Sequence, residues 1–483
     1  MPIFPLALPS GGNKGHEAHA GIAALINCYA EPAGPEQRTQ MQVWAAPGLD
    51  TLVTMAVTGG VRGLTEVDGL AYAVVGRTLV QVDSGGAVTV LGGIPSDGYV
   101  GMTRNQRSTG VQIVIVCDGL KWVVAGGTLS SITDPDLPPA SDVCVINGSA
   151  IFGIPDGRMF RSEINDATSV DGLDTESAQS SSDALLRVLD RGGDLIAIGD
   201  RSVEVWTDIG GEAFGFARAQ TIRVGAVGAR SVTKASVITG GLVTDTVAWI
   251  AADKDGAPAG IVMLDGYTPR KISDGEPWID RLIQNEADRT AIVATSWVSY
   301  GMGFIAFRFA STTIVYNTST QRWHERQSRS RGLATTWRVS HATVLGGRVL
   351  VGDHDNPKLY WLDEATFDED GDEMVLTVRT PPMVAFPGRL QIDRLYLDAV
   401  PGVGLVTGDA ADIDPQVMMR FSRDNETWST QRTRSLGAAG ERNRRVSWTS
   451  LGTLDQATVE FTCSAAVVRG LLGSSWDGKT LPP

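Results

Sequence analysis

The sequence is poor in cysteine, with only Cys28, Cys117, Cys144 and Cys463 among 483 residues. None of them forms a C-x-x-C pair or another spacing that suits zinc, and four thiols are too few for a disulfide scaffold at this length. Cys117 and Cys144 lie in apolar, strand-like runs, where a small buried thiol is the usual explanation. The cysteines therefore indicate neither a metal site nor a disulfide framework.

Long apolar runs are missing as well. No run approaches the roughly 20 apolar residues that a helix needs to span a bilayer. The first ten residues contain three prolines and no Lys or Arg, which does not fit a secretory signal peptide. We expect a soluble protein that is made in a reducing cytoplasm.

Positive charge is in deficit, with 41 Lys and Arg against 55 Asp and Glu and a formal net charge of -14. A surface that grips the phosphate backbone of a nucleic acid needs clustered Lys and Arg. The balance therefore argues against tight DNA binding. An acidic wall repels a polyanion, so a tube with such walls would let DNA slide without sticking, although charge alone does not decide whether this occurs.

Catalytic motifs are also absent. The sequence has no G-x-S-x-G, H-E-x-x-H or P-loop pattern. Its acidic stretch 363–373 lacks the ligand spacing of an EF-hand. We predict no enzymatic activity, no cofactor and no metal site. The histidines have no motif partner, so a surface or half-buried role is expected for each of them: His16, His19, His324, His341 and His354.

Glycine is abundant, with 56 residues, and short β-branched runs recur between the glycines. The clearest case lies within Leu185–Gln220, where the runs Asp194–Ile198 and Ser202–Trp206 flank a short Gly-Asp-Arg turn. A third run, Phe214–Ala219, follows a Gly-Gly pair. This composition and spacing predict a β-hairpin with an added strand.

Similar units recur seven times between about residue 59 and residue 362, and their central turns lie roughly 40 to 55 residues apart, the length of a propeller blade. Asp118-Gly119 and Asn147-Gly148 are favoured hairpin turn pairs. The predicted fold class is all-β: a β-propeller of about seven repeat units, with six blades possible, followed by a small C-terminal β-sandwich.

Three parts are expected along the chain. Residues 1–50 show little strand periodicity and are predicted to form an extended N-terminal docking arm. Residues 51–365 form the propeller, with one inserted helix near 276–287, where a Pro near the first helical position precedes an apolar face. The acidic stretch 363–373 is expected to be a solvated linker, and residues 366–483 form the β-sandwich.

Two patterns in the C-terminal part have both a plain and a functional interpretation. The segment Ser422–Trp428 is similar to the Asp-box of sialidase-type propellers, but Glu426 stands where glycine is expected, which favours an ordinary β-turn. A basic cluster follows, and we interpret it as a solvated hairpin tip, with contact to an acidic partner subunit as the alternative. Its members are Arg432, Arg434, Arg442, Arg444 and Arg445.

Four segments occur in a familiar order: 26–32, 160–169, 199–206 and 314–323. In this order the chain resembles the packaged-DNA stabilisation proteins of short-tailed bacteriophages, over nearly its full length. The resemblance implies a structural protein of the virion tail that is assembled in the host bacterial cytoplasm. It further implies the hub or nozzle ring of the tail, which closes the portal-adaptor exit, retains packaged DNA and provides its ejection conduit.

The resemblance also implies partners. These are further copies of the chain in a ring, expected to be a hexamer, the tail adaptor below the portal, and a distal tail plug, needle or tailspike. Double-stranded DNA would pass through the channel without sequence-specific binding, and no small-molecule substrate is expected. The interface candidates are Ile3, Phe4, Leu6, Asn27, Tyr29, Glu31, Arg442, Arg444 and Arg445.

Two other functions remain open. A glycan-binding or glycan-hydrolysing propeller would need a central pocket with convergent carboxylates or arginines. A general propeller scaffold for protein interactions would need neither. Oligomeric state and glycan binding distinguish these hypotheses from a tail protein.

Overall fold

The computed structural model describes residues 3–14, 22–34, 40–107, 110–178, 183–211 and 213–482. Two compact units account for the chain. The propeller unit consists of Thr51–Ala310 and Arg338–Trp361, and the sandwich unit consists of Met1–Asp50, Ser311–Trp337 and Leu362–Pro483. None of the helices in the described ranges is both long and apolar enough to cross a membrane.

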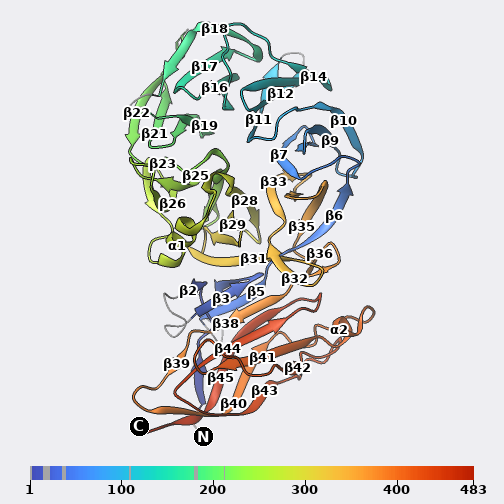
Figure 1. Ribbon diagram of the computed structural model, residues 1–483. Helices are drawn as coiled ribbons and strands as arrows, with labels where there is room; N and C mark the ends of the chain where they lie inside the picture. Colours follow the sequence, from blue (N-terminus) through green and yellow to red (C-terminus); the bar gives the residue numbers. More distant parts are fainter. Residues whose placement is uncertain are drawn as a thin grey trace. The chain divides into compact units, whose positions relative to one another are not determined.

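Antiparallel four-stranded meanders repeat through the propeller unit (Figure 1). The first four are made of strands that follow one another in the sequence, so each of these blades is a local structure. The first four blades are β7–β10 (Val61–Val67, Leu70–Val75, Thr78–Val82, Val88–Gly93), β11–β14 (Val100–Arg107, Gly110–Cys117, Leu120–Ala125, Thr128–Ser131), β15–β18 (Asp142–Ile146, Ser149–Gly153, Arg158–Glu163, Asp166–Ser177) and β19–β22 (Leu185–Arg191, Asp194–Gly199, Val203–Asp208, Phe216–Ile222).

Three further blades complete the series. The fifth contains β23–β27 (Gly225–Ala226, Val232–Thr239, Leu242–Ala252, Pro258–Asp265, Thr268–Lys271). The sixth contributes β28 and β29 (Val293–Ser299, Met302–Arg308) to this unit, and the seventh β33–β35 (Val339–Leu345, Arg348–Asp353, Lys358–Asp363). The helix expected near 276–287 is α1 (Pro277–Asn285), whose buried side chains Trp278, Ile279 and Ile283 form one face.

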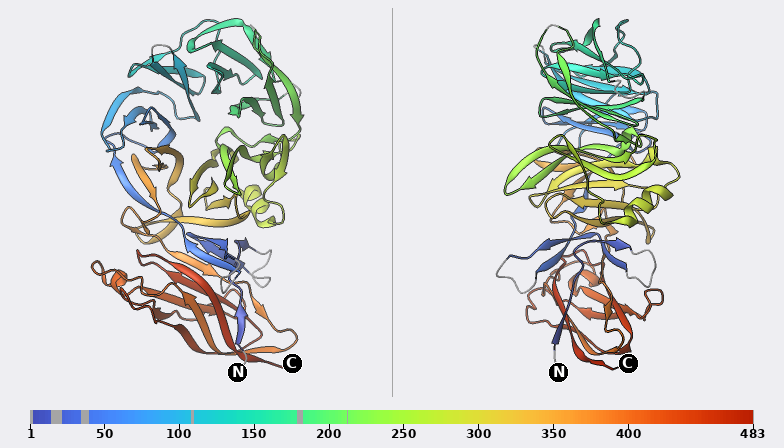
Figure 2. Two further views of the ribbon diagram at one scale, coloured as in Figure 1. Left: turned by 180° about the vertical axis from the view of Figure 1, so that it is seen from behind. Right: turned by 90° about the vertical axis from the view of Figure 1, so that its left-hand side faces the viewer.

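The first strands of the blades lie around a common centre. The inner strands β7, β11, β15, β19, β24, β28 and β33 follow one another around it, and all of them belong to the propeller unit. Figure 2 shows the sheets arranged radially in the view from behind. The predicted β-propeller is therefore confirmed, and the described residues contain seven inner strands rather than six.

The fourth blade shows why these sequences form strands. In β20 and β21 both faces are covered: Ile196 and Val205 pack in the core that contains Trp249 of the fifth blade, while Leu195 lies in the core that contains Cys144 of the third. A strand that is buried on both faces has a continuous apolar run rather than an alternating one. Burying one such side chain contributes about 1.5 to 3 kcal/mol.

The sandwich unit has two sheets. One contains β1, β4, β5, β45, β40 and β43 (Ile3–Leu6, Cys28–Pro32, Met41–Ala45, Gly470–Leu481, Arg389–Ala399, Val446–Leu454). The other contains β30, β31, β3, β38, β44, β41 and β42 (Thr313–Asn317, Arg322–Ser330, Ile22–Ile26, Leu376–Arg379, Gln456–Cys463, Gln416–Ser422, Arg432–Ser435). Leu395 and Trp448 of the first sheet share one core with Val459 and Phe461 of the second, which confirms the predicted β-sandwich.

Short elements complete this unit. β2 (Asn13–Lys14) pairs with β3, β32 (Leu333–Thr336) with β31, and β39 (Met383–Val384) with β44. α2 (Ala410–Ile413) is a single turn. β6 (Gly48–Thr54) begins in this unit, where Leu49 pairs in parallel with Glu369.

The N-terminal residues do not form the expected extended arm where the structure describes them. β3 pairs with β38, with Leu25 opposite Val378, and β5 pairs with β45. Leu25 and Cys28 lie in the core of the sandwich unit. The apolar content of this segment is therefore used to fill a core within the chain, and the division between the two units falls between Asp50 and Thr51.

The acidic stretch 363–373 is also more structured than the solvated linker that we expected. It contains the short hairpin of β36 (Asp368–Glu369) and β37 (Asp372–Glu373). Glu369 is buried, and its Oε1 lies 3.3 Å from Nη2 of the buried Arg326 and accepts a hydrogen bond from Nε1 of Trp337 at 3.0 Å. A buried carboxylate needs such partners, so the linker interpretation is wrong at Glu369.

Candidate functional site

A cavity of about 620 Å³ lies at the centre of the propeller unit. Its lining comes from the first halves of β7, β11, β19, β24, β28 and β33, from the loops that lead into some of them, and from Gly76 after β8 and His354 after β34. Inner strands of successive meanders run in the same direction, so their beginnings meet at the same end of the propeller. Volumes of about 300 to 1,000 Å³ are typical of small-molecule sites, and this cavity therefore has the size of a ligand pocket.

Arg62 forms part of the pocket wall and is held by backbone oxygens. Its Nε donates to the carbonyl of Gly76 at 2.7 Å, its Nη1 to Gly98 at 2.6 Å and its Nη2 to Ser96 at 2.6 Å. These bonds tie the first blade to the loop before β11. Arg62 is therefore chiefly a positioning residue, although its positive charge remains at the pocket.

Arg187 lines the pocket and connects three blades. Its Nε donates to Oδ2 of Asp142 at 2.6 Å, and its Nη1 donates to the carbonyls of Ala229 and Val232 at 3.1 and 3.0 Å. The guanidinium also lies over the ring of Tyr99, 4.6 Å from its centroid. Burial raises the pKa of the Asp142 carboxyl, against the opposing effect of Arg187. This buried pair holds the inner strands in place.

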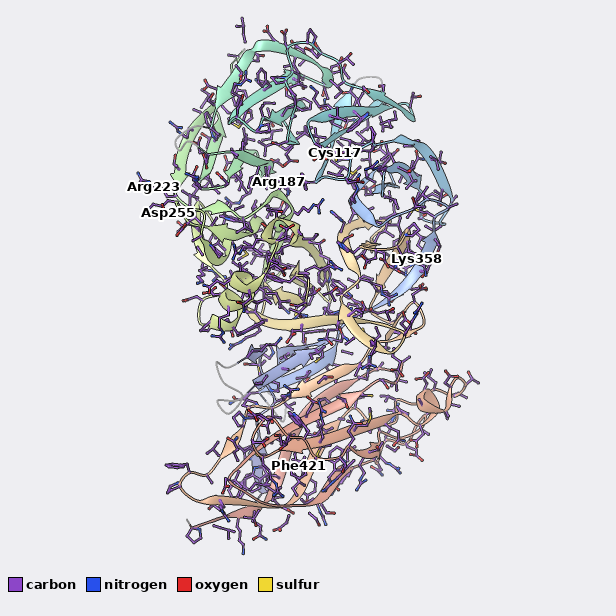
Figure 3. All side chains as sticks on the ribbon, viewed as in Figure 1. Cys117, Arg187, Arg223, Asp255, Lys358 and Phe421 are labelled. Atoms are coloured by element: carbon purple, nitrogen blue, oxygen red, sulfur yellow. The ribbon has the colours of Figure 1, made fainter. Side chains whose placement is uncertain are left out.

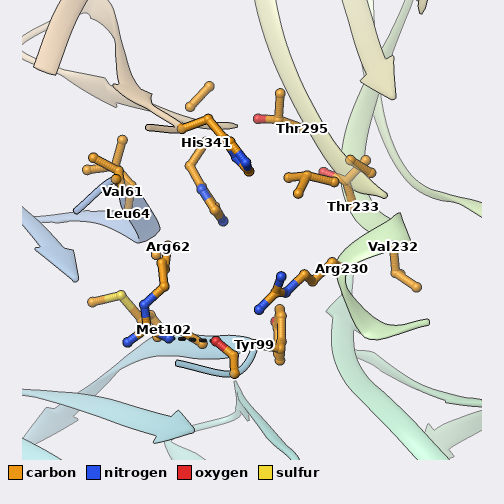
Figure 4. Close-up of a pocket in the computed structure, with 18 of the residues that line it drawn as sticks. Val61, Arg62, Leu64, Tyr99, Met102, Arg230, Val232, Thr233, Thr295 and His341 are labelled. Atoms are coloured by element: carbon orange, nitrogen blue, oxygen red, sulfur yellow. Dashed lines mark hydrogen bonds between the residues drawn. The ribbon is translucent and has the colours of Figure 1, made fainter. Parts of the chain in front are cut away.

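Arg230 lies in the short turn η2 (Ala229–Ser231) before β24, and Figure 4 shows its guanidinium directed towards the open centre of the pocket. Within the described part of the chain, one hydrogen bond holds this guanidinium: Nη2 donates to the carbonyl of Asp97 at 3.1 Å. The carboxylate of Asp97 is paired with Arg77 instead. Since a guanidinium has five N–H donors, Arg230 retains most of its donors for another group.

Two histidines lie close to Arg230. Burial lowers the pKa of His341 to about 4, and the charges of His354 and Arg230 add to this effect. Burial and the charge of Arg308 lower the pKa of His354, while Asp355 opposes the shift. Both imidazoles are therefore neutral at pH 7, and both lie in surroundings where added positive charge is unfavourable.

The remaining lining combines one more cation with apolar and hydroxyl groups. Lys234 lies at the rim, with its Nζ 3.5 Å from Oδ2 of Asp190. Val61, Leu64, Val100 and Met102 form an apolar wall, and Thr233 and Thr295 contribute hydroxyl groups. Among the lining residues that the structure describes, Asp97 is the only carboxylate. The pocket therefore offers donors and positive charge but no carboxylate pair for hydrolysis.

Both units of the chain match one phage protein. Residues 7–367 match the family described as the β-propeller of bacteriophage P22 Gp10, and residues 378–461 match the family described as its β-sandwich. The chain belongs to the bacteriophage P22 Gp10 family. These matches confirm the resemblance to a packaged-DNA stabilisation protein that the sequence predicted. They also confirm the prediction that the chain is a structural protein of a phage.

Solved structures similar to this Gp10-family chain are distant from it. A streptogramin B lyase structure is 13% identical, with 65% of this chain and 96% of that chain covered and a TM-score of 0.43. The virginiamycin B lyase of Staphylococcus aureus is 13% identical, with 65% and 98% covered and a TM-score of 0.44, and the WD40 repeats of RRP9 are 11% identical, with 66% and 99% covered and a TM-score of 0.39. No curated protein matches the sequence.

The interface candidates near the N-terminus lie in the sandwich unit of this Gp10-family chain, outside the pocket. Ile3 is exposed, whereas Phe4 stacks on Trp476 with ring centroids 4.6 Å apart. Three side chains are buried, which removes them from an accessible surface: Leu6, Asn27 and Tyr29. Their apolar or polar groups are used inside the unit, so the prediction of a docking role is not supported for these three.

Asn27 has a defined structural task. Its Nδ2 donates to the carbonyl of Val375 at 3.1 Å, and its Oδ1 accepts a hydrogen bond from the backbone N–H of Gln327 at 2.9 Å. Asn27 lies between β3 and β4, and its φ of 54° is a left-handed conformation that Asn tolerates better than most residues. Glu31 is half-buried, and burial raises its pKa.

The basic cluster does not form the predicted hairpin tip, because β42 pairs with β41 in one sheet and β43 pairs with β40 in the other. Arg442, Arg444 and Arg445 lie in the loop between β42 and β43, and Nη1 of Arg444 is 3.8 Å from a carboxylate oxygen of Glu441. Arg432 and Arg434 donate to the carbonyls of Thr449 and Ser447 of the neighbouring strand. The outer three arginines therefore remain candidates for a contact with another molecule.

The segment Ser422–Trp428 forms a tight turn, as expected. Oδ1 of Asp424 accepts hydrogen bonds from the backbone N–H groups of Glu426 and Thr427 at 2.9 and 2.7 Å. The hydroxyl and backbone N–H of Thr427 lower the pKa of Asp424 well below its ordinary value. The carboxylate of this turn stabilises the loop, and the segment lies in the sandwich unit rather than in a blade.

Sequence reasoning missed the central pocket. His341 and His354 showed no motif partner, and they meet Arg230 only because β33, the loop after β34 and η2 converge at the propeller centre. His324 is buried rather than exposed or half-buried, and His16 and His19 lie outside the described residues. Among the described residues, no group of three or more His, Cys, Asp or Glu is placed to hold a metal ion. All four cysteines are free and buried.

Proposed function

We propose that this Gp10-family protein forms the hub or nozzle ring of a short phage tail, where it closes the exit below the portal and its adaptor. In this role it retains packaged DNA and provides the conduit for its ejection. One observation carries the proposal: the propeller and the sandwich both match the corresponding parts of Gp10, in the same order. The net charge of -14 supports a conduit that does not bind DNA tightly.

The proposed partners are further copies of the chain in a hexameric ring, the tail adaptor, and a plug, needle or tailspike at the distal end. DNA would pass along the ring axis, where we expect acidic or neutral side chains. The pocket at the centre of the propeller is a separate feature. Its volume is that of a small-ligand site, so it is not a candidate for the conduit.

Deletion of the whole N-terminal segment would not test this proposal, because Leu25 and Cys28 belong to the sandwich core. Light scattering after size-exclusion chromatography, together with electron micrographs of the full chain, is the direct test. Six-fold rings are the expected result. A monomer at every concentration, with no rings in the micrographs, would contradict the proposal.

Charge reversal at Arg442, Arg444 and Arg445 tests whether the basic cluster takes part in an interface. If the cluster contacts an acidic surface of a neighbour, replacing all three with Glu weakens ring formation, and high salt has the same effect. Replacing the same three residues with Lys keeps the charge and serves as the control. Rings that form equally well with all three variants would remove the cluster from the interface.

Glycan binding is the second candidate, because the structure contains a central pocket with arginines at its wall, as that hypothesis required. Convergent carboxylates are absent from the described lining, so binding is favoured over hydrolysis. Titration of the full chain with acidic and neutral oligosaccharides, followed by calorimetry, separates this candidate from a purely structural role.

A further inference from the structure

We propose that the central cavity of the propeller unit binds a small organic anion, whose oxyanion head lies against Arg230, His341 and His354 and whose body lies against Leu64 and Met102. The proposal goes beyond the tail function, which requires no small ligand. It rests on the arrangement of donors, carboxylates and apolar groups in the pocket.

The first step concerns the donors. Arg230 uses one hydrogen bond to the carbonyl of Asp97, and its guanidinium is directed into the open centre in Figure 4. A planar guanidinium with several unused N–H groups fits the two or three oxygens of a carboxylate or phosphate. The arrangement therefore presents a fork of donors to a ligand in the cavity.

The second step concerns a buried polar atom. Nδ1 of His341 is buried and has no hydrogen-bond partner among the described residues, while the backbone of Val61 acts on the same imidazole and raises its pKa against the effect of burial. Buried polar atoms in native proteins nearly always have a partner, and an unpaired one is unfavourable by about 1 to 3 kcal/mol. A ligand in the pocket would supply this partner, and Figure 4 shows the imidazole of His341 facing the same centre as Arg230.

The third step concerns counter-charges. Three carboxylates near the pocket have cationic partners: Asp97 pairs with Arg77, Asp142 with Arg187 and Asp190 with Lys234. Two more carry charge in the neighbourhood: Asp288 accepts hydrogen bonds from Thr290 and feels the charge of Arg230, and Asp355 lies 3.9 Å from both Arg308 and His354. None of the first three carboxylates pairs with Arg230 among the described contacts. Since a positive charge in a partly enclosed site favours an anion, an oxyanion is the group that complements Arg230.

The fourth step concerns the body of the ligand. The apolar part of the pocket lining is formed by Val61, Leu64, Val100 and Met102. An apolar or aromatic group against this wall would be removed from water, which favours binding by roughly 25 cal/mol per Å² of apolar surface. An organic anion therefore suits the pocket better than an inorganic one. The volume of about 620 Å³ admits a molecule of this class.

Calorimetric titration of the full-length protein with phenyl phosphate tests the proposal, with inorganic phosphate and phenol as the matched probes. Phenyl phosphate is expected to bind more tightly than either probe, because only phenyl phosphate combines the oxyanion with the apolar body. No binding of phenyl phosphate at millimolar concentration overturns the proposal. Equal affinity for phenyl phosphate and inorganic phosphate would overturn the assignment of the apolar wall.

Substitution of Arg230 locates the site. Arg230→Gln is expected to weaken phenyl phosphate binding about tenfold or more, since a hydrogen bond to a charged group contributes about 1.5 to 3 kcal/mol. Arg230→Lys keeps the charge and is expected to bind with intermediate affinity. Arg223→Gln makes the same charge change at an exposed position outside the lining, labelled at the outer side of the blades in Figure 3, and is expected to leave affinity unchanged.

Equal affinity of Arg230→Gln and wild type would overturn the site assignment, and equal weakening by Arg223→Gln would point to a general charge effect and overturn it as well. Histidine resonances give a second measurement. Bound anion is expected to shift the signals of His341 and His354, and unchanged signals at saturation contradict the proposal. Ring formation is measured separately by light scattering, so failure of this inference and failure of the tail function remain distinguishable.

Discussion

The two units of this protein reach an all-β structure by different routes. In the propeller unit, strands that are neighbours in the sequence are also neighbours in a blade, as in β19–β22. In the sandwich unit, β3 lies between β31 and β38, and Asn27 bonds to Val375, 348 residues further along the chain. Local pairing makes a blade recognisable from its own sequence, whereas the sandwich depends on distant segments.

The units also treat buried charge differently. The sandwich unit encloses its charges: the side chains of Arg326 and Glu369 are 0% and 1% exposed, and the guanidinium of Arg326 lies over the ring of Trp337, 4.5 Å from its centroid. The propeller unit also encloses a pair, Arg187 with Asp142, but it leaves the donors of Arg230 directed into a cavity. A closed network serves stability, and an open one is available to a ligand.

The largest expected effect comes from opening the closed network. Glu369→Gln removes the charge partner of Arg326, and breaking a buried pair in this way lowers the free energy of unfolding by about 3 to 5 kcal/mol. Hydrogen-exchange mass spectrometry during urea denaturation measures the effect separately for each unit. The sandwich unit is expected to lose protection first, while the blades retain theirs.

Glu364→Gln provides the control, because it removes the same charge from an exposed position in the same acidic stretch. Its effect on unfolding is expected to stay within about 0.5 kcal/mol. If both variants destabilise the protein equally, Glu369 has no special structural role and the contrast between a closed and an open network is not valid.

A smaller effect is expected on how the stability of each unit depends on pH, and one histidine from each unit tests it. Burial, followed by the charge of Arg326, lowers the pKa of His324 in the sandwich unit to about 3, and burial lowers that of His341 in the propeller unit to about 4. Unfolded histidine has a pKa near 6.5. At a pH between the folded and the unfolded pKa, the histidine binds a proton in the unfolded state but not in the folded state. The free energy of unfolding therefore falls as the pH decreases below about 6.5.

Each histidine contributes at most about 1.4 kcal/mol per pH unit to this slope. His324→Gln is expected to flatten the acid sensitivity of the sandwich unit, and His341→Gln that of the propeller unit, when urea midpoints are followed from pH 7 to pH 5. The same slope in wild type and in both variants would show that other groups cause the acid sensitivity.

The blades could be predicted from sequence because two paired strands and the turn between them lie close together in the chain, as with β20 and β21 on either side of Asp200-Arg201. Burial also made the strands of the fourth blade predictable. A strand whose two faces are both buried has a largely apolar sequence, which is easy to recognise. Asp183 lies outside that pattern, yet its carboxylate accepts hydrogen bonds from the backbone N–H groups of Arg201 and Ser202 and fixes the turn.

The N-terminal strands and the pocket could not be predicted in this way. The run around Leu25 has only the two-residue strand β2 as a nearby antiparallel partner among the described residues, and its longer partner, with Val378 opposite Leu25, lies more than 300 residues away. Arg230, His341 and His354 carry no common motif, and only closure of the ring of inner strands brings them together. The sequence shows that these side chains are polar or charged. It does not show that they meet at one end of the propeller, because that depends on how all the blades are arranged.

The smallest expected effect tests a local turn, the type of feature that made the blades predictable. Asn147, between β15 and β16, has a φ of 51°, and its amide also bonds to Asp208. Asn147→Ala and Asn147→Gly both remove that hydrogen bond, but only glycine adopts a positive φ without steric strain. The Ala variant is therefore expected to be about 1 kcal/mol less stable than the Gly variant, measured as the difference between their urea midpoints. Equal stability would show that the turn relaxes, so that the predictability of the blade depends on its apolar runs rather than on its turn residues.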